Sequence, residues 1–149
     1  MNTLIASTKH NQKETLSFLL EQHIELKKLI DALFSKAWNT NSIEPLLEIR
    51  SLNSSCISKY NDLIINDEVV IDKLSVTGFS ILNDYNSGLD LYEINEKLAK
   101  MIPVYRKAIK NIHLSSFVRM LVSINMEKLL LAKENLLHPV QDVLDAMSA

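Results

Sequence analysis

The stretch QKETLSFLLEQHIELKKLIDALFSKA, residues 12–37, decides the fold. It contains two interleaved series of mostly apolar residues, and each series repeats every seven residues. The two series are Leu16, His23, Ile30 and Ala37, and Leu19, Leu26 and Leu33. Such a pattern lines one side of a helix with an apolar seam, and seams of this kind pack helices side by side. The single polar residue in the seam is His23.

Length and composition indicate one globular domain covering residues 1–149. Apolar residues make up 47% of the chain, and there are only two glycines and three prolines. Because β folds need frequent turns, so few chain breakers disfavour an all-β protein. The formal net charge of −2 predicts no overall attraction to nucleic acid or to an anionic membrane.

Cys56 is the only cysteine, so the sequence cannot form an internal disulfide or a zinc site built from several cysteines. Residues 1–10 lack the continuous apolar run of a signal peptide. No apolar run approaches the length of a membrane span. We therefore expect a cytoplasmic protein with no membrane-spanning segment.

The first helix is expected to end near Trp38, with Ser7, Thr8 or Asn11 as its N-terminal cap. Three further long helices are predicted after it. The second helix covers residues 43–65. A capping pattern at Asp90 and Glu93 begins the third helix, and we expect this helix to kink near Met101 because of Pro103. The inner face of the second helix consists of Leu46, Ile49, Asn53, Cys56, Tyr60 and Leu63.

Residues 67–85 are the hardest part of the chain to assign. Three consecutive β-branched residues, 69–71, suit a strand, but the segment also keeps helical spacing and has no second strand to pair with. An isolated strand would leave backbone groups unpaired, so we interpret the segment as helical, either as one helix or as two.

The last long helix covers residues 117–137 after a connector at 113–116 that ends in a capping Ser115 or Ser116. Its apolar face is unusually broad, which is typical of a helix that has an additional partner. We expect His138-Pro139 to end it and residues 139–149 to form a short amphipathic tail. The apolar residues of this tail are Val140, Val143, Leu144 and Met147.

The predicted fold is therefore all-α, an antiparallel four-helix bundle with a possible fifth helical segment. The layout, together with VYRKAI at 104–109 and FVRMLV at 117–122, resembles small bacterial ferritin-like proteins. Metal-binding members of that family place a Glu on each of two helices and Glu-x-x-His on the other two. No Glu-x-x-His occurs in this sequence, so the resemblance implies a relative that lacks the metal ligands.

A second resemblance covers one helix: TLSFLLEQHIEL at 15–26 looks like the opening helix of a hemerythrin-like domain. In that family one such His binds a di-iron centre, together with His-x-x-x-Glu and His-x-x-x-His from later helices. The predicted second helix contains no histidine, and the last contains only His138, at its end. We therefore expect no iron site of this type.

His23 is the best candidate site residue. It could bind a metal ion or accept a buried proton, but a core histidine bonded to Asn53 or to a tyrosine is the favoured interpretation. We expect surface contacts at two pairs with metal-ligand spacing, His10/Glu14 and Glu134/His138. Cys56, in the middle of an apolar face, is expected to fill the core.

Charged and aromatic residues offer weaker candidates. Five basic residues between positions 97 and 110 could contact nucleic acid, but a solvated face paired with Glu93 and Glu96 explains them better, so we do not expect nucleic-acid binding. The basic residues are Lys97, Lys100, Arg106, Lys107 and Lys110, and a smaller acidic group consists of Asp67, Glu68 and Asp72. Trp38, near Phe34, could anchor a partner protein.

The resulting hypothesis is a non-enzymatic protein that self-associates or binds another protein through an apolar helix face. It requires no cofactor, and its expected contact residues are Trp38 and the four apolar residues of the tail. The alternative is a ferritin-like metal-binding enzyme that uses His23.

Overall fold

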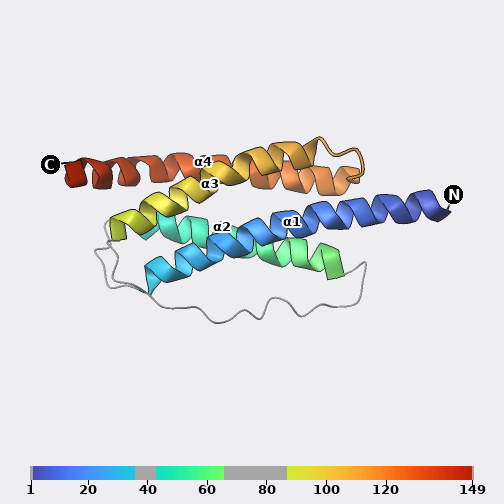
Figure 1. The fold of residues 1–149 in the computed structure, drawn as a ribbon, viewed down its shortest axis with the longest axis horizontal. Helices are drawn as coiled ribbons and strands as arrows, with labels where there is room; N and C mark the ends of the chain where they lie inside the picture. The colour runs from blue at the N-terminus through green and yellow to red at the C-terminus, as the bar shows by residue number, and fades with distance from the viewer. Residues whose placement is uncertain (1, 36–42, 66–86, 149) are drawn as a thin grey trace.

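The computed structural model describes residues 2–35, 43–65 and 87–148, which form four α-helices and no strand (Figure 1). The helices are α1 (Asn2–Phe34), α2 (Ile43–Ile65), α3 (Ser87–Ile109) and α4 (Ser116–Ser148). The predicted all-α four-helix bundle is confirmed. Among these helices, none combines the length and the apolar character that crossing a lipid bilayer requires.

Each helix has two neighbours in the bundle. Helix α1 packs against α2 and α3, and α4 packs against α3 and α2. Figure 1 shows that the helices of each neighbouring pair run in opposite directions. Helices α2 and α3 instead run in the same direction and lie across the bundle from each other. Residues 66–86 separate α2 from α3 in the chain, so no short loop forces these two helices to be antiparallel neighbours.

The core is built from the residues that the heptad pattern predicted. Leu16, Leu19, Leu26, Ile30 and Leu33 are all buried on α1. They meet apolar side chains from the other three helices in one continuous cluster. Fully buried side chains of this size contribute about 1.5–3 kcal/mol each to the hydrophobic stabilisation, which explains why the seam determines the fold.

The N-terminal ends of two helices differ from the prediction. Helix α1 begins at Asn2 and ends at Phe34, so Ser7, Thr8 and Asn11 lie inside it and do not cap it. No glycine or proline interrupts residues 2–12, and Thr15 Oγ1 bonds back to the Asn11 carbonyl at 3.1 Å. Helix α3 begins at Ser87, three residues before the predicted capping pattern.

The end of α4 also differs, since the helix continues through Pro139 to Ser148. A proline inside a helix removes only its own hydrogen bond and strains the turn before it, while the bonds on both sides remain. Helix α3 likewise continues through Pro103. Residues 139–148 are therefore the last turns of α4 and not a separate tail, and Figure 1 shows these turns extending beyond the other helices.

The α3–α4 connection is held by side chains. Arg119 donates from Nε to the Ile109 carbonyl at 3.1 Å and from Nη2 to the Asn111 carbonyl at 2.6 Å. Ser115 Oγ accepts the Val118 N–H at 3.3 Å, which confirms Ser115 as the predicted cap of α4. Asn111 Nδ2 reaches Thr15 Oγ1 at 2.8 Å and so ties the connection to α1.

Several sequence-based predictions concern residues outside the described parts of the chain. These are the helical segment at 67–85, the acidic group Asp67, Glu68 and Asp72, and the proposed anchor Trp38. Phe34 is described, and the Arg50 guanidinium lies 4.9 Å from the centre of its ring.

Candidate functional site

A network of polar side chains occupies the centre of the core, and all four helices contribute to it. Its members are His23 from α1, Asn53 and Tyr60 from α2, Tyr105 from α3 and Asn125 from α4, each at most 2% exposed. Asn53 and Tyr60 share one face of α2 because they are two helical turns apart. Helical spacing therefore places both of these side chains on the buried face of α2.

His23 uses both of its ring nitrogens. Nδ1 lies 2.6 Å from Asn53 Oδ1, and Nε2 lies 2.5 Å from the Tyr105 hydroxyl. Asn53 Nδ2 also donates to the backbone carbonyl of His23 at 2.9 Å, so α1 and α2 are joined twice at this level. The favoured interpretation, a core histidine bonded to Asn53 and to a tyrosine, is confirmed.

The network continues from Tyr105 to α4. The hydroxyl oxygens of Tyr105 and Tyr60 are 2.7 Å apart, and Asn125 Nδ2 donates to the Tyr60 hydroxyl at 2.9 Å. The His23 ring lies against both tyrosine rings, with centroids 5.7 and 5.8 Å apart. An unbroken line of hydrogen bonds thus crosses the core from Asn53 to Asn125.

Backbone chemistry fixes the direction of every bond in this line. A carbonyl only accepts, so the Asn53 group facing the His23 carbonyl is the NH₂, and its Oδ1 must face the ring. His23 Nδ1 therefore carries the proton, and Nε2 accepts from the Tyr105 O–H. The Tyr105 oxygen then accepts from the Tyr60 O–H, and the Tyr60 oxygen accepts from Asn125.

Burial controls the protonation states of the site. Removal from water lowers the pKa of His23 to about 4. The hydrogen bond that His23 donates to Asn53 opposes this shift, and the positive charge of Lys97 adds to it. Burial also raises the pKa of Tyr60 and of Tyr105 above the ordinary tyrosine value. At neutral pH the imidazole and both phenols are therefore uncharged.

Cys56 lies beside this network, with its thiol against the Tyr105 hydroxyl. The side chain is 1% exposed, and burial raises the pKa of the thiol to about 11. A nucleophilic cysteine needs a lowered pKa and access to its target, and Cys56 has neither. The expectation that Cys56 fills the core is confirmed.

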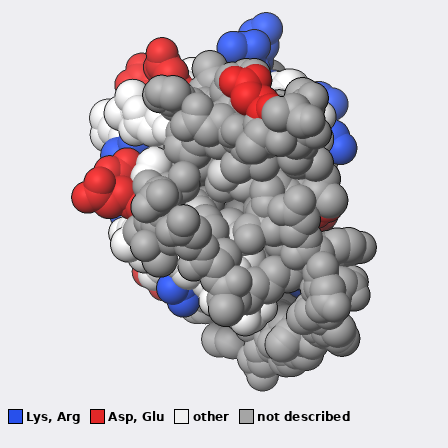
Figure 2. All heavy atoms as spheres, turned by 90° about the vertical axis from the view of Figure 1, so that its left-hand side faces the viewer, with Lys and Arg blue, Asp and Glu red and all other residues white. Residues whose placement is uncertain are grey.

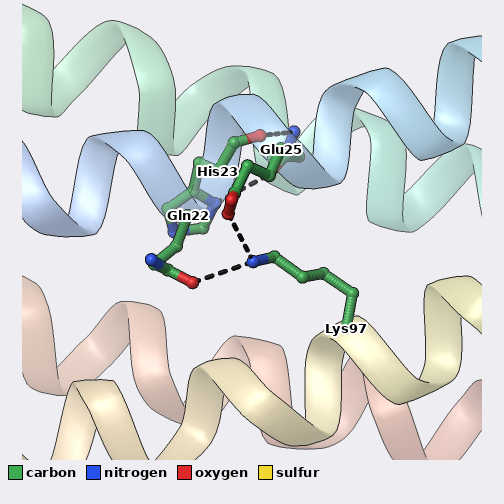
Figure 3. A network of polar contacts seen from close by, with 5 residues as sticks. Gln22, His23, Glu25 and Lys97 are labelled. Carbon is green, nitrogen blue, oxygen red and sulfur yellow. Dashed lines mark hydrogen bonds and ion pairs between the residues drawn. The ribbon is translucent and has the colours of Figure 1, made fainter.

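Lys97 closes one side of the site at the α1–α3 contact. Figure 3 shows it reaching from α3 towards Gln22 and Glu25, which flank His23 on α1. Its Nζ lies 2.9 Å from an oxygen of each. The expected partners, Glu93 and Glu96, are thus replaced by groups on another helix, because Lys97 is mostly buried between α1 and α3.

The other basic residues of the predicted stretch, Lys100, Arg106, Lys107 and Lys110, are exposed, as expected for a solvated face. Figure 2 shows basic and acidic side chains interspersed on the described part of one end of the bundle. The described part of this end therefore shows no continuous basic surface of the kind typical of nucleic-acid-binding proteins.

The described residues do not fit a metal centre around His23. Both ring nitrogens are occupied by protein groups, so a metal ion would have to displace Asn53 or Tyr105. No group of three His, Cys, Asp or Glu residues suited to a metal ion occurs within the described parts of the chain. The side chains of His10 and His138 are not described, so the pairs His10/Glu14 and Glu134/His138 remain predictions.

Helix α4 carries a second candidate feature, an exposed apolar stripe. Phe117, Ile124 and Leu131 are seven residues apart and 61%, 41% and 58% exposed, and Met120, between the first two, is 55% exposed. These four residues form the α4 stripe. They lie on the side of the helix opposite its buried residues, which are Val118, Val122, Asn125, Leu129, Ala132 and Leu136.

The sequence-based prediction identified part of each feature. The last helix was predicted to have an unusually broad apolar face, and apolar side chains such as Ile124 and Leu131 are exposed on it. Asn125 was missed as a network member. The signal was present, because Asn125 falls in register with Val118, Val122 and Leu129 on the buried face.

Comparison with protein-family models, with curated proteins and with solved structures gives no match to this chain.

Proposed function

We propose that this protein is non-enzymatic and acts by association through the α4 stripe, with a second copy of the chain as its simplest partner. The observation that carries the proposal is the exposure of four large apolar side chains in one line along α4. Apolar surface that is arranged in this way is typical of sites that bind another protein.

The spacing of the stripe supports a helical partner. The same seven-residue interval separates the buried residues of the α1 seam, where it packs one helix against others. A two-fold symmetric pair would bring the stripe of one copy onto the stripe of its partner, so that one surface serves both. The last turns of α4, which extend beyond the other helices, would lengthen such a contact. The tail residues Val140, Val143, Leu144 and Met147 remain its predicted contributors.

The buried network supports a structural role for the core. Each of the five members is hydrogen-bonded to at least one other and is at most 2% exposed, so the network offers no surface to a substrate. Buried polar groups that are fully paired fix how helices align, and they stabilise a single arrangement of the bundle.

We further propose that the chain is a ligand-free relative of ferritin-like bundles. Ferritin-like folds have one long crossover, and the parallel direction of α2 and α3 is consistent with that connectivity. The competing hypothesis is a metal-binding enzyme that uses His23. Elemental analysis of protein purified without chelator separates them: stoichiometric iron, manganese or zinc that is lost in His23→Gln would support the enzyme.

The proposed association is tested by light scattering coupled to size exclusion. The full chain, 17.0 kDa as a monomer, is expected to elute as a dimer or larger. The double variant Met120→Glu/Leu131→Glu should be monomeric, because two charges would be buried in the contact. The matched control is Phe18→Glu/Leu47→Glu, which alters two side chains of similar exposure, 51% and 45%, on other helices.

The control variant is expected to keep the assembly of the unmodified chain. A chain that ends at His138 tests the contribution of the last turns of α4 and should associate more weakly. A full chain that is strictly monomeric and unaffected by removal of residues 139–149 would reject self-association.

A further inference from the structure

The hydrogen bonds of the buried network all run the same way. Asn125 donates to Tyr60, Tyr60 to Tyr105, Tyr105 to His23, and His23 to Asn53. Each hydroxyl and each ring nitrogen therefore has one assigned role as long as His23 carries one ring proton. A second proton on the ring removes the acceptor, Nε2, to which the Tyr105 hydroxyl donates.

A doubly protonated His23 donates from both nitrogens. The Tyr105 oxygen would then accept from Nε2, and its O–H would turn towards the Tyr60 oxygen, 2.7 Å away. The Tyr60 O–H would in turn need an acceptor, and the Asn125 amide supplies one if it turns to present its oxygen. The Cys56 sulfur, which also lies against Tyr105, is a weaker acceptor than a phenol oxygen.

We propose that this network is an acid-sensing relay: a proton bound by His23 reverses the hydrogen bonds of Tyr105 and Tyr60 and turns the side-chain amide of Asn125 on α4. The reversal needs no movement of the backbone, because each oxygen keeps its neighbours and only the hydrogen positions and one amide change. The relay links α1, where the proton binds, to the helix across the bundle.

The groups around His23 determine when the relay acts. From α2 the ring faces Asn53 and Tyr60, and from α3 it faces Tyr105, with the charge of Lys97 nearby. Cys56, also on α2, lies against Tyr105. Helix α4 contributes Asn125, and the charge of Lys128 acts on Cys56. On α1 itself, Gln22 and Glu25 hold Lys97. Burial and the charge of Lys97 lower the pKa of His23 to about 4. The ring therefore takes its second proton only in acid, and the relay does not act at neutral pH.

The Asn53 end of the network borders a cleft. A cleft of about 90 Å³ lies between α1 and α2, and Asn53 forms part of its wall. The lining residues are Lys27, Ile30, Asp31, Arg50, Asn53 and Ser54. A brief opening of this wall would expose the His23 ring, whose unprotonated nitrogen, Nε2, is the atom that takes the added proton.

The test is a pH titration of the isotope-labelled full chain followed by NMR. At neutral pH the ring nitrogen shifts of His23 should show Nδ1 protonated and Nε2 unprotonated. On acidification, the side-chain amide signals of Asn125 should move with the same midpoint as the His23 ring, near pH 4. The inference does not depend on the function of the α4 stripe, because the titration is followed within the chain.

The variant Tyr60→Phe removes the oxygen that links Tyr105 to Asn125 while keeping the ring. His23 should still titrate in this variant, and Asn125 should no longer follow it. The matched control is Tyr92→Phe, which removes a hydroxyl from an exposed tyrosine and should leave the coupled titration intact. If Tyr60→Phe does not fold, the titration of the unmodified chain still decides the matter.

Three results would overturn the relay. One is an Asn125 amide that stays unchanged while His23 titrates, since the proton of Tyr105 would then go to Cys56. Another is a His23 ring that carries its neutral-state proton on Nε2 or titrates near the ordinary histidine pKa. The third is cooperative loss of all native signals before His23 titrates, because the folded bundle would then have a single hydrogen-bond arrangement.

Discussion

Acidification should destabilise the bundle through one residue, His23. The folded state holds the ring uncharged and lowers its pKa from 6.5 to about 4, chiefly because burial removes it from water. In the unfolded chain the ring is solvated and binds a proton at the ordinary pKa. Between these two values the unfolded state binds more protons than the folded state, so the stability falls as the pH falls.

The size of the effect follows from the shift in pKa. A shift from 6.5 to about 4 corresponds to about 3 kcal/mol at 1.36 kcal/mol per pH unit. The His23 contribution should be complete above pH 6.5, decline steadily to about pH 4, and stay constant below it. Since domains of this size are stable by about 5–15 kcal/mol, the loss is a large fraction of the total.

Urea unfolding, measured at intervals from pH 7 to pH 4, tests this prediction. The reference is His23→Gln, which keeps a polar side chain that does not titrate. Carboxylates titrate in both proteins, so the difference between their two pH profiles isolates His23. If the two profiles are parallel over this range, or if the unmodified chain is equally stable at pH 6.5 and pH 4, the reasoning about the buried imidazole is refuted.

Three further predictions concern packing, the thiol and the helix connection. Leu26→Ala, at a fully buried seam position, should lower the free energy of unfolding by about 2–5 kcal/mol in urea titrations, whereas the exposed Leu47→Ala should cost under about 0.5 kcal/mol; equal costs would contradict the assigned core. Cys56 should resist a thiol reagent in the native protein and react only as urea unfolds it, because it is buried and its pKa is raised to about 11. Rapid native-state labelling would show an open site. Arg119→Ala should destabilise the fold by about 1–3 kcal/mol through loss of two bonds to carbonyls at the end of α3, with the exposed Arg106→Ala nearly neutral as its control.

Periodicity in the sequence predicted those parts of the fold that depend on which side of a helix is apolar. The seam from Leu16 to Leu33 and the inner face of α2 from Leu46 to Tyr60 are buried as expected. Both bounds of α2 also agree with the prediction. A heptad pattern is local and repeats many times, so several residues specify the same face, and one polar exception does not obscure it.

Helix ends and cross-helix partners were predicted less well. A few backbone hydrogen bonds decide where α1 and α3 begin and whether α4 continues through Pro139. The periodicity of apolar residues carries no information about these bonds. The partners of Lys97 are on α1, far away in the sequence, so a search for nearby charges found Glu93 and Glu96 instead. The bond between His23 and Asn53 was anticipated because both residues fall on inner faces, whereas Asn125 was overlooked within a strongly apolar helix.

The most direct test of the proposed association is the solvent accessibility of the α4 stripe in the unmodified chain. Methyl groups of labelled leucines can be followed by NMR as a soluble paramagnetic agent is added. Leu131 and Leu47 are 58% and 45% exposed in a single chain, so in a monomer the agent should broaden Leu131 at least as strongly as Leu47. If two copies associate through the α4 stripe, Leu131 will be protected while Leu47 stays accessible. Broadening of Leu131 equal to or greater than that of Leu47, at concentrations used for light scattering, would contradict the proposal.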